Sequence, residues 1–216
     1  MNKLITGIQA ETLTPFAYHS LMVQQGTATL PELISDHAIM FGLAASLGMM
    51  DASPCLPTKD YRRDVSQMPW RASVFTTYEP RLLPPLVRRL NLTEEAGYRK
   101  RIQDVVKKGN LKDYFTTQEV PPGVTFRGAL FGYDPFAETG QDEIVIRIGL
   151  HRNGMVRLSK PNPDKGELPI EQVQLNAATA HLFQRELSVA RYLLHGIQLS
   201  PAMSLQEARA EVLQWK

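Results

Sequence analysis

Hydrophobic and polar positions alternate through residues 3–13, KLITGIQAETL. Leu4, Ile8 and Ala10 fall on one face of an extended chain, whereas Gln9 and Glu11 fall on the other. Because successive side chains of a strand point to opposite faces, the alternation predicts a half-buried β-strand.

The next dense apolar stretch, SDHAIMFGLAASLG at residues 35–48, has the signals of a helix. Ser35 or Asp36 can cap its amino end, and Gly48 can end it. His37 then lies in the first turn, and we interpret it as a structural residue rather than a ligand.

Apolar positions return in VTFRGALFGYDPF, which follows Pro121-Pro122-Gly123 and predicts a second part of the sheet. Gly128 and Gly132 within it allow a close backbone approach or a bulge. Their spacing matches neither a dinucleotide-binding loop nor a P-loop.

Residues 144–159, IVIRIGLHRNGMVRLS, predict a β-hairpin folded at Asn153-Gly154, because both central positions of a type I′ turn take positive φ. A two-residue loop would place Arg152 opposite Met155 and Leu150 opposite Arg157. One face of the tip would then carry two guanidinium groups, which suits a chain of phosphates. A solvated hairpin whose charges serve solubility is the alternative.

Four other segments complete the expected organisation. Residues 51–85 are rich in proline and turn-forming residues and predict irregular structure, and residues 92–109 predict a helix capped by Thr93. After a predicted strand in IEQVQLN, Asn176 is expected to cap a helix over residues 177–195 that Gly196 closes. Ser204 and Glu207 have the capping-box spacing of a short terminal helix.

The bulk composition is that of a folded globular protein, with 43% hydrophobic and 21% charged residues among 216. We expect a core domain made of residues 1–50 and 118–216, interrupted by a basic insertion at residues 51–117. The single cysteine, Cys55, excludes an internal disulfide and a cysteine-based zinc site. Without a long apolar run or an export leader, we expect a cytoplasmic protein.

The formal charge of +2 conceals a strong segregation. Residues 59–112 hold thirteen Lys/Arg against six Asp/Glu, whereas residues 1–58 hold one lysine against four acids. A local positive potential of this kind attracts a polyanion, and nucleic acid is the first candidate. An acidic protein partner is the competing interpretation.

Aromatic and basic residues interleave in the first part of the basic segment, as Tyr61-Arg62-Arg63, Trp70-Arg71 and Tyr78. Such residues can stack on bases while neutralising phosphates, as in single-strand binders. Trp70 and Tyr78 as anchors of a loop on the core are the alternative. Arg99, Lys100 and Arg101 lie in the middle of the predicted helix 92–109, where the helix dipole does not call for them, and favour contact with a partner.

Recognisable catalytic motifs are missing from the sequence: there is no HExxH pair, no GxSxG elbow and no kinase or Walker signature. His151 beside Arg152 could act as a general acid or base in RNA cleavage, but a histidine in a cationic hairpin is more often a binding residue. We therefore predict a non-enzymatic protein without a metal or cofactor, with an RNA-processing endoribonuclease as the alternative.

The order of these parts resembles a known family. An amino-terminal strand, the helix LISDHAIMFGLAASLG, a basic insertion and the late segment IVIRIGLHRNGMVRLS are similar to the handle-binding subunit (Cas five type) of class 1 CRISPR effector complexes. That subunit belongs to the CRISPR-associated RAMP superfamily, and the type I-D and type IV forms are the nearest. The resemblance covers about a quarter of the chain.

The resemblance implies an α+β protein with a ferredoxin-like, RRM-related antiparallel sheet core, a partly helical, thumb-like insertion and C-terminal helices. It implies antiviral defense through a ribonucleoprotein complex, in which the subunit holds the 5′ handle of the guide RNA (crRNA) and caps the backbone filament. The implied partners are that RNA, the backbone and large subunits, and target DNA near the end of the complex, with no membrane. Gly128 and Gly132 are the candidates for the family's glycine-rich loop.

We predict that cationic and aromatic residues distant in the sequence converge into one groove for a single RNA strand. A structural subunit that docks an acidic partner without touching RNA is the alternative. The predicted RNA-binding residues are Arg62, Arg63, Trp70, Arg71, Arg99, Lys100, Arg101, Arg147, His151, Arg152 and Arg157.

Overall fold

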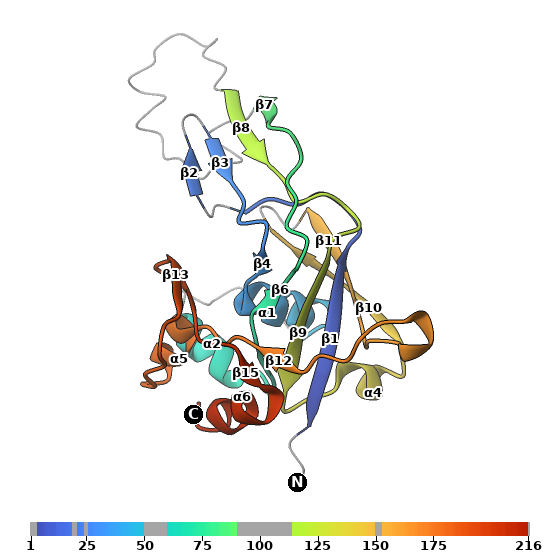
Figure 1. The fold of residues 1–216 in the computed structure, drawn as a ribbon, viewed down its shortest axis with the longest axis vertical. Coiled ribbons are helices and arrows are strands. Elements are labelled where there is room, and N and C mark those ends of the chain that lie inside the picture. The colour runs from blue at the N-terminus through green and yellow to red at the C-terminus, as the bar shows by residue number, and fades with distance from the viewer. Residues whose placement is uncertain are drawn as a thin grey trace.

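The computed structural model describes residues 4–18, 21–23, 26–49, 60–89, 114–149 and 153–215. A curled sheet with helices and C-terminal segments packed around it forms the main body, and a smaller sheet lies beyond one end (Figure 1). The elements are β1 (Ile5–Thr12), β2 (Leu21–Val23), β3 (Gly26–Ala28), β4 (Leu33–Ile34), α1 (Asp36–Ser46), α2 (Tyr61–Gln67), β5 (Arg71–Ala72), β6 (Phe75–Thr76), β7 (Leu86–Arg89), β8 (Tyr114–Gln118), β9 (Thr125–Phe131), α4 (Pro135–Thr139), β10 (Glu143–Ile148), β11 (Gly154–Ser159), the 3-10 turn η2 (Pro163–Lys165), β12 (Gln172–Val173), α5 (Ala177–Leu182), β13 (Arg191–Leu194), β14 (Ile197–Leu199), β15 (Met203–Ser204) and α6 (Leu205–Val212).

Within the described residues the main sheet has seven strands, in the order β10-β11-β1-β9-β6-β4, with β5 also beside β9. All of its strand pairs are antiparallel, and β1 lies between β9 and β11. The predicted first strand is therefore confirmed, as a central strand of the sheet. The mixed α+β class predicted for the chain is also confirmed.

Helix α1 packs against the sheet at β10 and β5. Its amino end is capped as predicted, because Ser35 Oγ accepts a hydrogen bond from the Ala38 amide at 3.2 Å. Gly48 follows the helix with a φ of +70°. A side chain at Gly42 would lie only 3.1 Å from Ile146, so this glycine lets the helix approach the sheet closely.

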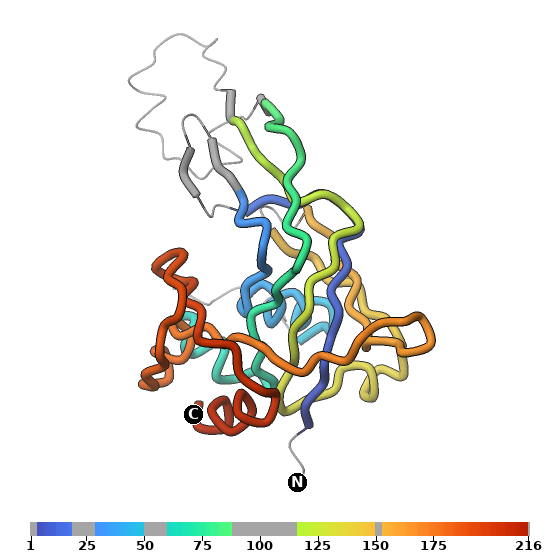
Figure 2. Tube along the Cα trace, in the orientation of Figure 1, coloured from blue at the N-terminus to red at the C-terminus, as the bar shows by residue number. Residues whose placement is uncertain are grey.

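The C-terminal segment covers part of the opposite face of the sheet. It crosses in front of β1 and β9 in the view of Figure 2, and Ile170 lies against Gly7 of β1. The chain then reaches α6, where Ser204 and Glu207 form the predicted capping box. The central strands β1 and β9 are thus covered on the face opposite α1 as well.

The first described part of the expected basic insertion, residues 60–76, packs against the main body. Asp60 caps α2, and Val65 of this helix is fully buried in the core, which corrects the irregular structure predicted for residues 51–85. Strands β5 and β6 pair with β9 of the main sheet. The smaller sheet has the order β2-β3-β8-β7. Residues 51–59 and the predicted helix 92–109 lie outside the described residues.

The predicted hairpin exists, but its connection and register differ from the prediction. Ile148 pairs with Gly154, and Val145 rather than Leu150 lies opposite Arg157. The connection therefore runs from residue 149 to residue 153, with Gly149 at a φ of +80°. Gly154 belongs to β11 and does not have a positive φ. Glycine is needed at this position because Phe16 packs so closely that a Cβ would lie 2.3 Å from Phe16 Cβ.

The helix predicted over residues 177–195 is also shorter than its pattern indicates. Asn176 caps α5 as expected, but the helix ends after Leu182. Gln184 takes a left-handed φ of +58°, and the Arg185 amide donates to Ala180 O at 3.1 Å. This is the Schellman ending of a helix, and residues 191–199 then form the β13–β14 hairpin rather than another helical turn.

Replacing Gln184 by glycine is expected to raise the free energy of unfolding by about 1 kcal/mol, because a left-handed backbone is strained for residues with a side chain. Gln184→Ala is the matched control and should leave stability nearly unchanged. Urea unfolding of the three proteins measures the difference. Stabilisation by alanine as large as that by glycine would contradict the assignment.

Candidate nucleic-acid interface

A groove of about 600 Å³ lies where α1, α2 and the end of β10 meet. Tyr61 and Arg147, more than eighty residues apart in the sequence, both line it. Segments from the basic part of the chain and from the hairpin therefore converge on one surface. The groove is lined by Tyr18, Ser35, His37, Ala38, Phe41, Gly42, Ala45, Ser46, Tyr61, Asp64, Val145, Arg147, Ile148 and Gly149.

Three rings form an aromatic cluster on one side of the groove. The His37 ring stacks on that of Tyr61 with centroids 5.1 Å apart and an angle of 22° between their planes. Phe41 approaches both rings edge-on, at 6.2 Å from His37 and 5.9 Å from Tyr61. Tyr61 remains 48% exposed, so the cluster leaves an aromatic surface accessible to a ligand.

Arg147 supplies the positive charge of the groove. It lies on β10, where Ile144, Ile146 and Ile148 point into the core and the alternate residues remain exposed. Among the described residues no carboxylate forms an ion pair with Arg147, so its guanidinium is available to an anionic ligand. Ser46 Oγ of α1 donates to Val145 O at 3.0 Å and fixes the helix beside this strand.

The other two predicted cations of this region lie on α2. Arg62 is exposed. Arg63 forms a salt bridge with Asp64 at 2.8 Å, and this hydrogen bond raises the pKa of the guanidinium above its ordinary value. Of the three arginines, only Arg147 lines the groove, whereas Arg62 and Arg63 lie on the helix that supplies Tyr61 and Asp64 to it. The charge of Arg63 is partly neutralised by Asp64.

Trp70 and Arg71 take structural positions instead of the predicted RNA contacts. Trp70 is 1% exposed and packs against Tyr133, with ring centroids 5.1 Å apart. Arg71 Nη1 donates to Met68 O and Trp70 O at 2.8 Å, and its guanidinium lies 5.1 Å from the centroid of the Phe183 ring. Burial lowers the pKa of Arg71. The Trp70 ring is therefore closed off from a strand of RNA, and the half-buried Arg71 guanidinium is already engaged by two carbonyls and an aromatic ring.

Arg157 is held by two carboxylates on neighbouring strands. Its Nη2 lies 2.5 Å from Glu11 Oε2, and its Nη1 lies 3.4 Å from Glu143 Oε2. The hydrogen bond to Glu11 is the largest cause of the raised pKa of Arg157. A phosphate would have to compete with both acids, so the structure argues against the contact predicted for this residue.

Five of the predicted RNA-binding residues lie outside the described residues, and their roles stay predictions: Arg99, Lys100, Arg101, His151 and Arg152.

The two glycines proposed for a glycine-rich loop have packing roles. A Cβ at Gly128 would lie 2.5 Å from the Phe75 ring, and Gly132 combines a φ of +97° with a close approach to Pro69 O.

Sequence reasoning missed His37 and Phe41 as parts of a site. Their spacing of four residues on a predicted helix places them on the same face, which is the local signal that could have found them. Tyr18 is also part of the wall: its hydroxyl donates to Leu33 O at 2.5 Å, and burial raises its pKa. The three rings of the cluster meet because α1 packs against α2, and no local sequence pattern shows this packing.

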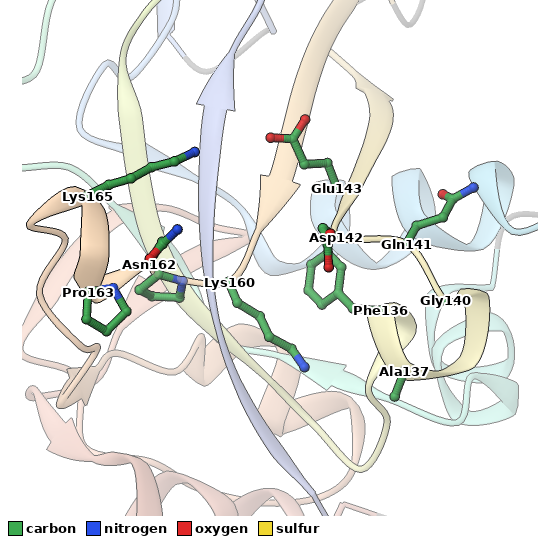
Figure 3. Close-up of a pocket in the computed structure, with 11 residues that line it drawn as sticks. Phe136, Ala137, Gly140, Gln141, Asp142, Glu143, Lys160, Asn162, Pro163 and Lys165 are labelled. Carbon is green, nitrogen blue, oxygen red and sulfur yellow. The ribbon is translucent and has the colours of Figure 1, made fainter.

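A second hollow of about 760 Å³ lies between α4 and the segment after β11 (Figure 3). Lys160 Nζ is bound by Asp134 at 2.6 Å and lies 5.6 Å from the Phe136 ring centroid. Figure 3 shows Asp142 and Glu143 around the same hollow as Lys160 and Lys165. Its charges are mixed, so it fits a polyanion less well than the groove beside Arg147.

No helix in the described part of the chain has the length and apolar character needed to cross a bilayer. The described residues also contain no group of three or more His, Cys, Asp and Glu that could hold a metal ion. No protein-family model matches the chain, and no curated protein is significantly similar to it.

Proposed function

We propose that the protein binds single-stranded RNA through the groove between α1, α2 and β10. The observation that carries the proposal is the placement on one surface of the exposed Tyr61 ring and the Arg147 guanidinium, which no described carboxylate pairs with. Aromatic stacking on bases combined with a positive charge for the phosphates is the usual basis of single-strand binding. Arg62 on α2 adds a further exposed cation to the same helix as Tyr61.

Within this function, we propose the handle-binding role in a class 1 CRISPR effector complex that the sequence resemblance implies. The strand order supports it. Strands β1 and β6 are both antiparallel to β9, which lies between them, and α1 lies between them in the sequence. This arrangement is the one expected of a split βαβ unit, and in the proposal β11, on the other side of β1, takes the place of the fourth strand of a ferredoxin-like sheet.

The partners in this proposal are the guide RNA, the backbone and large subunits of the complex, and target DNA near its end. The subunit is non-catalytic, caps the filament and works in the cytoplasm. RNA in such a complex is held by cationic side chains and by stacking on exposed bases rather than by groove reading of a duplex.

Binding of a single-stranded RNA of about 12 nucleotides is expected to weaken strongly between low and moderate salt. Arg147→Gln should lower the affinity about fivefold and reduce the slope of log K against log salt by about 0.7, because one phosphate contact is lost. Lys165→Gln is the matched control, since Lys165 is exposed but does not line the groove. Fluorescence anisotropy at several salt concentrations measures both quantities.

Equal losses for Arg147→Gln and Lys165→Gln would show that binding is not centred on the groove. Purified protein that binds no RNA but captures an acidic protein would support the docking alternative. Cleavage products from labelled repeat RNA would contradict the non-catalytic assignment.

A further inference from the structure

Hydrogen bonds connect the buried Asp36 carboxylate to the wall of the groove. Thr179 Oγ1 donates to Asp36 Oδ2 at 2.5 Å, and Asn176 Nδ2 donates to Asp36 Oδ1 at 3.0 Å. Asp36 and Thr179 are both fully buried. Thr179 Oγ1 also lies 3.2 Å from His37 Nε2. Because the hydroxyl gives its only proton to the carboxylate, it accepts from His37, and Nε2 carries the hydrogen.

The buried hydrogen bonds from Asp36 through Thr179 therefore fix both the tautomer and the orientation of the His37 ring. Tyr61 stacks on this ring and Phe41 meets its plane at 86°, so its rotation is restricted from three sides. In the neutral ring, Nδ1 is left as a hydrogen-bond acceptor. No described residue bonds to it, although His37 lines the groove.

We propose that this groove holds one unpaired nucleobase of the bound strand. The base lies edge to edge with the His37 ring, on the part of the Tyr61 face that His37 leaves uncovered, so that one of its N–H groups donates to His37 Nδ1. Arg147 contacts the adjoining phosphate. The inference rests on the proposed function and specifies which part of the RNA enters the site. A groove of about 600 Å³ falls in the size range of small-molecule sites, about 300–1,000 Å³.

The chemistry of the lining favours a nucleotide over an acidic peptide. A carboxylate would use Arg147, but it brings neither a donor for His37 Nδ1 nor a flat ring for the part of Tyr61 that His37 leaves uncovered. A nucleotide supplies the ring, the N–H donor and the anion within one repeating unit. Thr179 and Asp36 do not touch the base in this arrangement and are positioning residues for His37.

The first test compares one RNA with a series in which a single base at a time is replaced by an abasic site. Removal of one particular base should lower the affinity about tenfold, because one stacking contact is lost. Tyr61→Ala should cause a similar loss with intact RNA and little further loss with that abasic RNA. Tyr61→Phe is the matched control, because it keeps the ring and should keep the affinity.

The second test measures the tautomer of His37 by ¹⁵N NMR. The wild-type protein and Thr179→Ser should both carry the proton on Nε2, since serine retains the hydroxyl. Thr179→Val removes the acceptor and should give a mixture of tautomers, with a smaller difference in affinity between intact and abasic RNA. If the valine variant fails to fold, the wild-type spectrum and the Tyr61 comparison still decide the outcome.

The results separate this inference from the function on which it rests. RNA binding that weakens with Arg147→Gln but is indifferent to every abasic position would overturn the base site and leave RNA binding intact. A His37 ring that carries its proton on Nδ1 in the wild-type protein would overturn the hydrogen bond to the base. Absence of RNA binding under all conditions would overturn both proposals.

Discussion

Replacing Trp70 by alanine is expected to lower the free energy of unfolding by about 3–5 kcal/mol, the usual cost of removing a large aromatic ring from a packed core. The ring is 1% exposed and packs against Tyr133. Arg71 Nη1 donates to the backbone carbonyl of Trp70, and Arg71 in turn lies over Phe183, so the cavity would open where several elements meet. Urea unfolding followed by circular dichroism measures the loss.

Trp70→Phe is the informative control. The Trp70 Nε1 atom is buried without a hydrogen-bond partner among the described residues, so phenylalanine removes volume but no hydrogen bond. It should cost no more than about 2 kcal/mol. RNA affinity should be unchanged in this variant. A stable Trp70→Ala protein that has lost RNA binding would contradict the burial of the ring and return Trp70 to the interface.

Trp70 also shows why the site could be predicted only in part. In the sequence, Trp70-Arg71 and Tyr61-Arg62 are equivalent pairs of an aromatic and a basic residue. The fold separates them, because residue 71 begins β5 beside β9 whereas Tyr61 begins α2 at the surface. A pattern of alternating aromatic and basic residues shows only which residue types occur along the chain. Whether each side chain is exposed depends on which elements of the fold pack over it.

The charge pattern has the same limit. Arg147 and Arg157 lie on adjacent strands and have the same formal charge, but Arg157 is bound by Glu11 and Glu143 while Arg147 has no acidic partner in the described part of the chain. Glu11 is 146 residues away from Arg157 in the sequence. Only the pairing of β1 with β11 brings the two together, so their neutralisation could not be anticipated from local sequence.

Features encoded within a few residues could be predicted well. The caps at Ser35 and Ser204 and the strand at β1 depend on local hydrogen bonds or alternation, and all are confirmed. The length of α5 depends instead on where the chain turns away, at Gln184, a residue type without a strong preference for that conformation. The groove depends on three elements distant in the sequence, and its histidine gains a fixed tautomer only from a threonine 142 residues away.

Gly154→Ala is expected to lower the free energy of unfolding by about 3 kcal/mol, near the upper end of ordinary overpacking. The added Cβ would lie 2.3 Å from Phe16 Cβ and 3.1 Å from Ile148 O. Phe16 cannot move away easily, because its amide and carbonyl both bond to Val120, at 3.3 and 2.9 Å. The strain therefore falls on two backbone segments at once. Thermal or urea unfolding measures it.

Gly128→Ala provides the matched comparison, since the clash there is with ring atoms of Phe75, at 2.5 to 2.7 Å, rather than with a Cβ. Phe75→Ala removes those atoms, so the double variant should be more stable than the sum of the single losses by about 1–2 kcal/mol. Phe16→Ala leaves its Cβ in place, and the Gly154 double variant should show almost no such coupling. Equal coupling in the Gly128/Phe75 and Gly154/Phe16 pairs would contradict the close approach of the two backbones at Gly154. The Asn-Gly turn signal in the sequence does not explain this close approach.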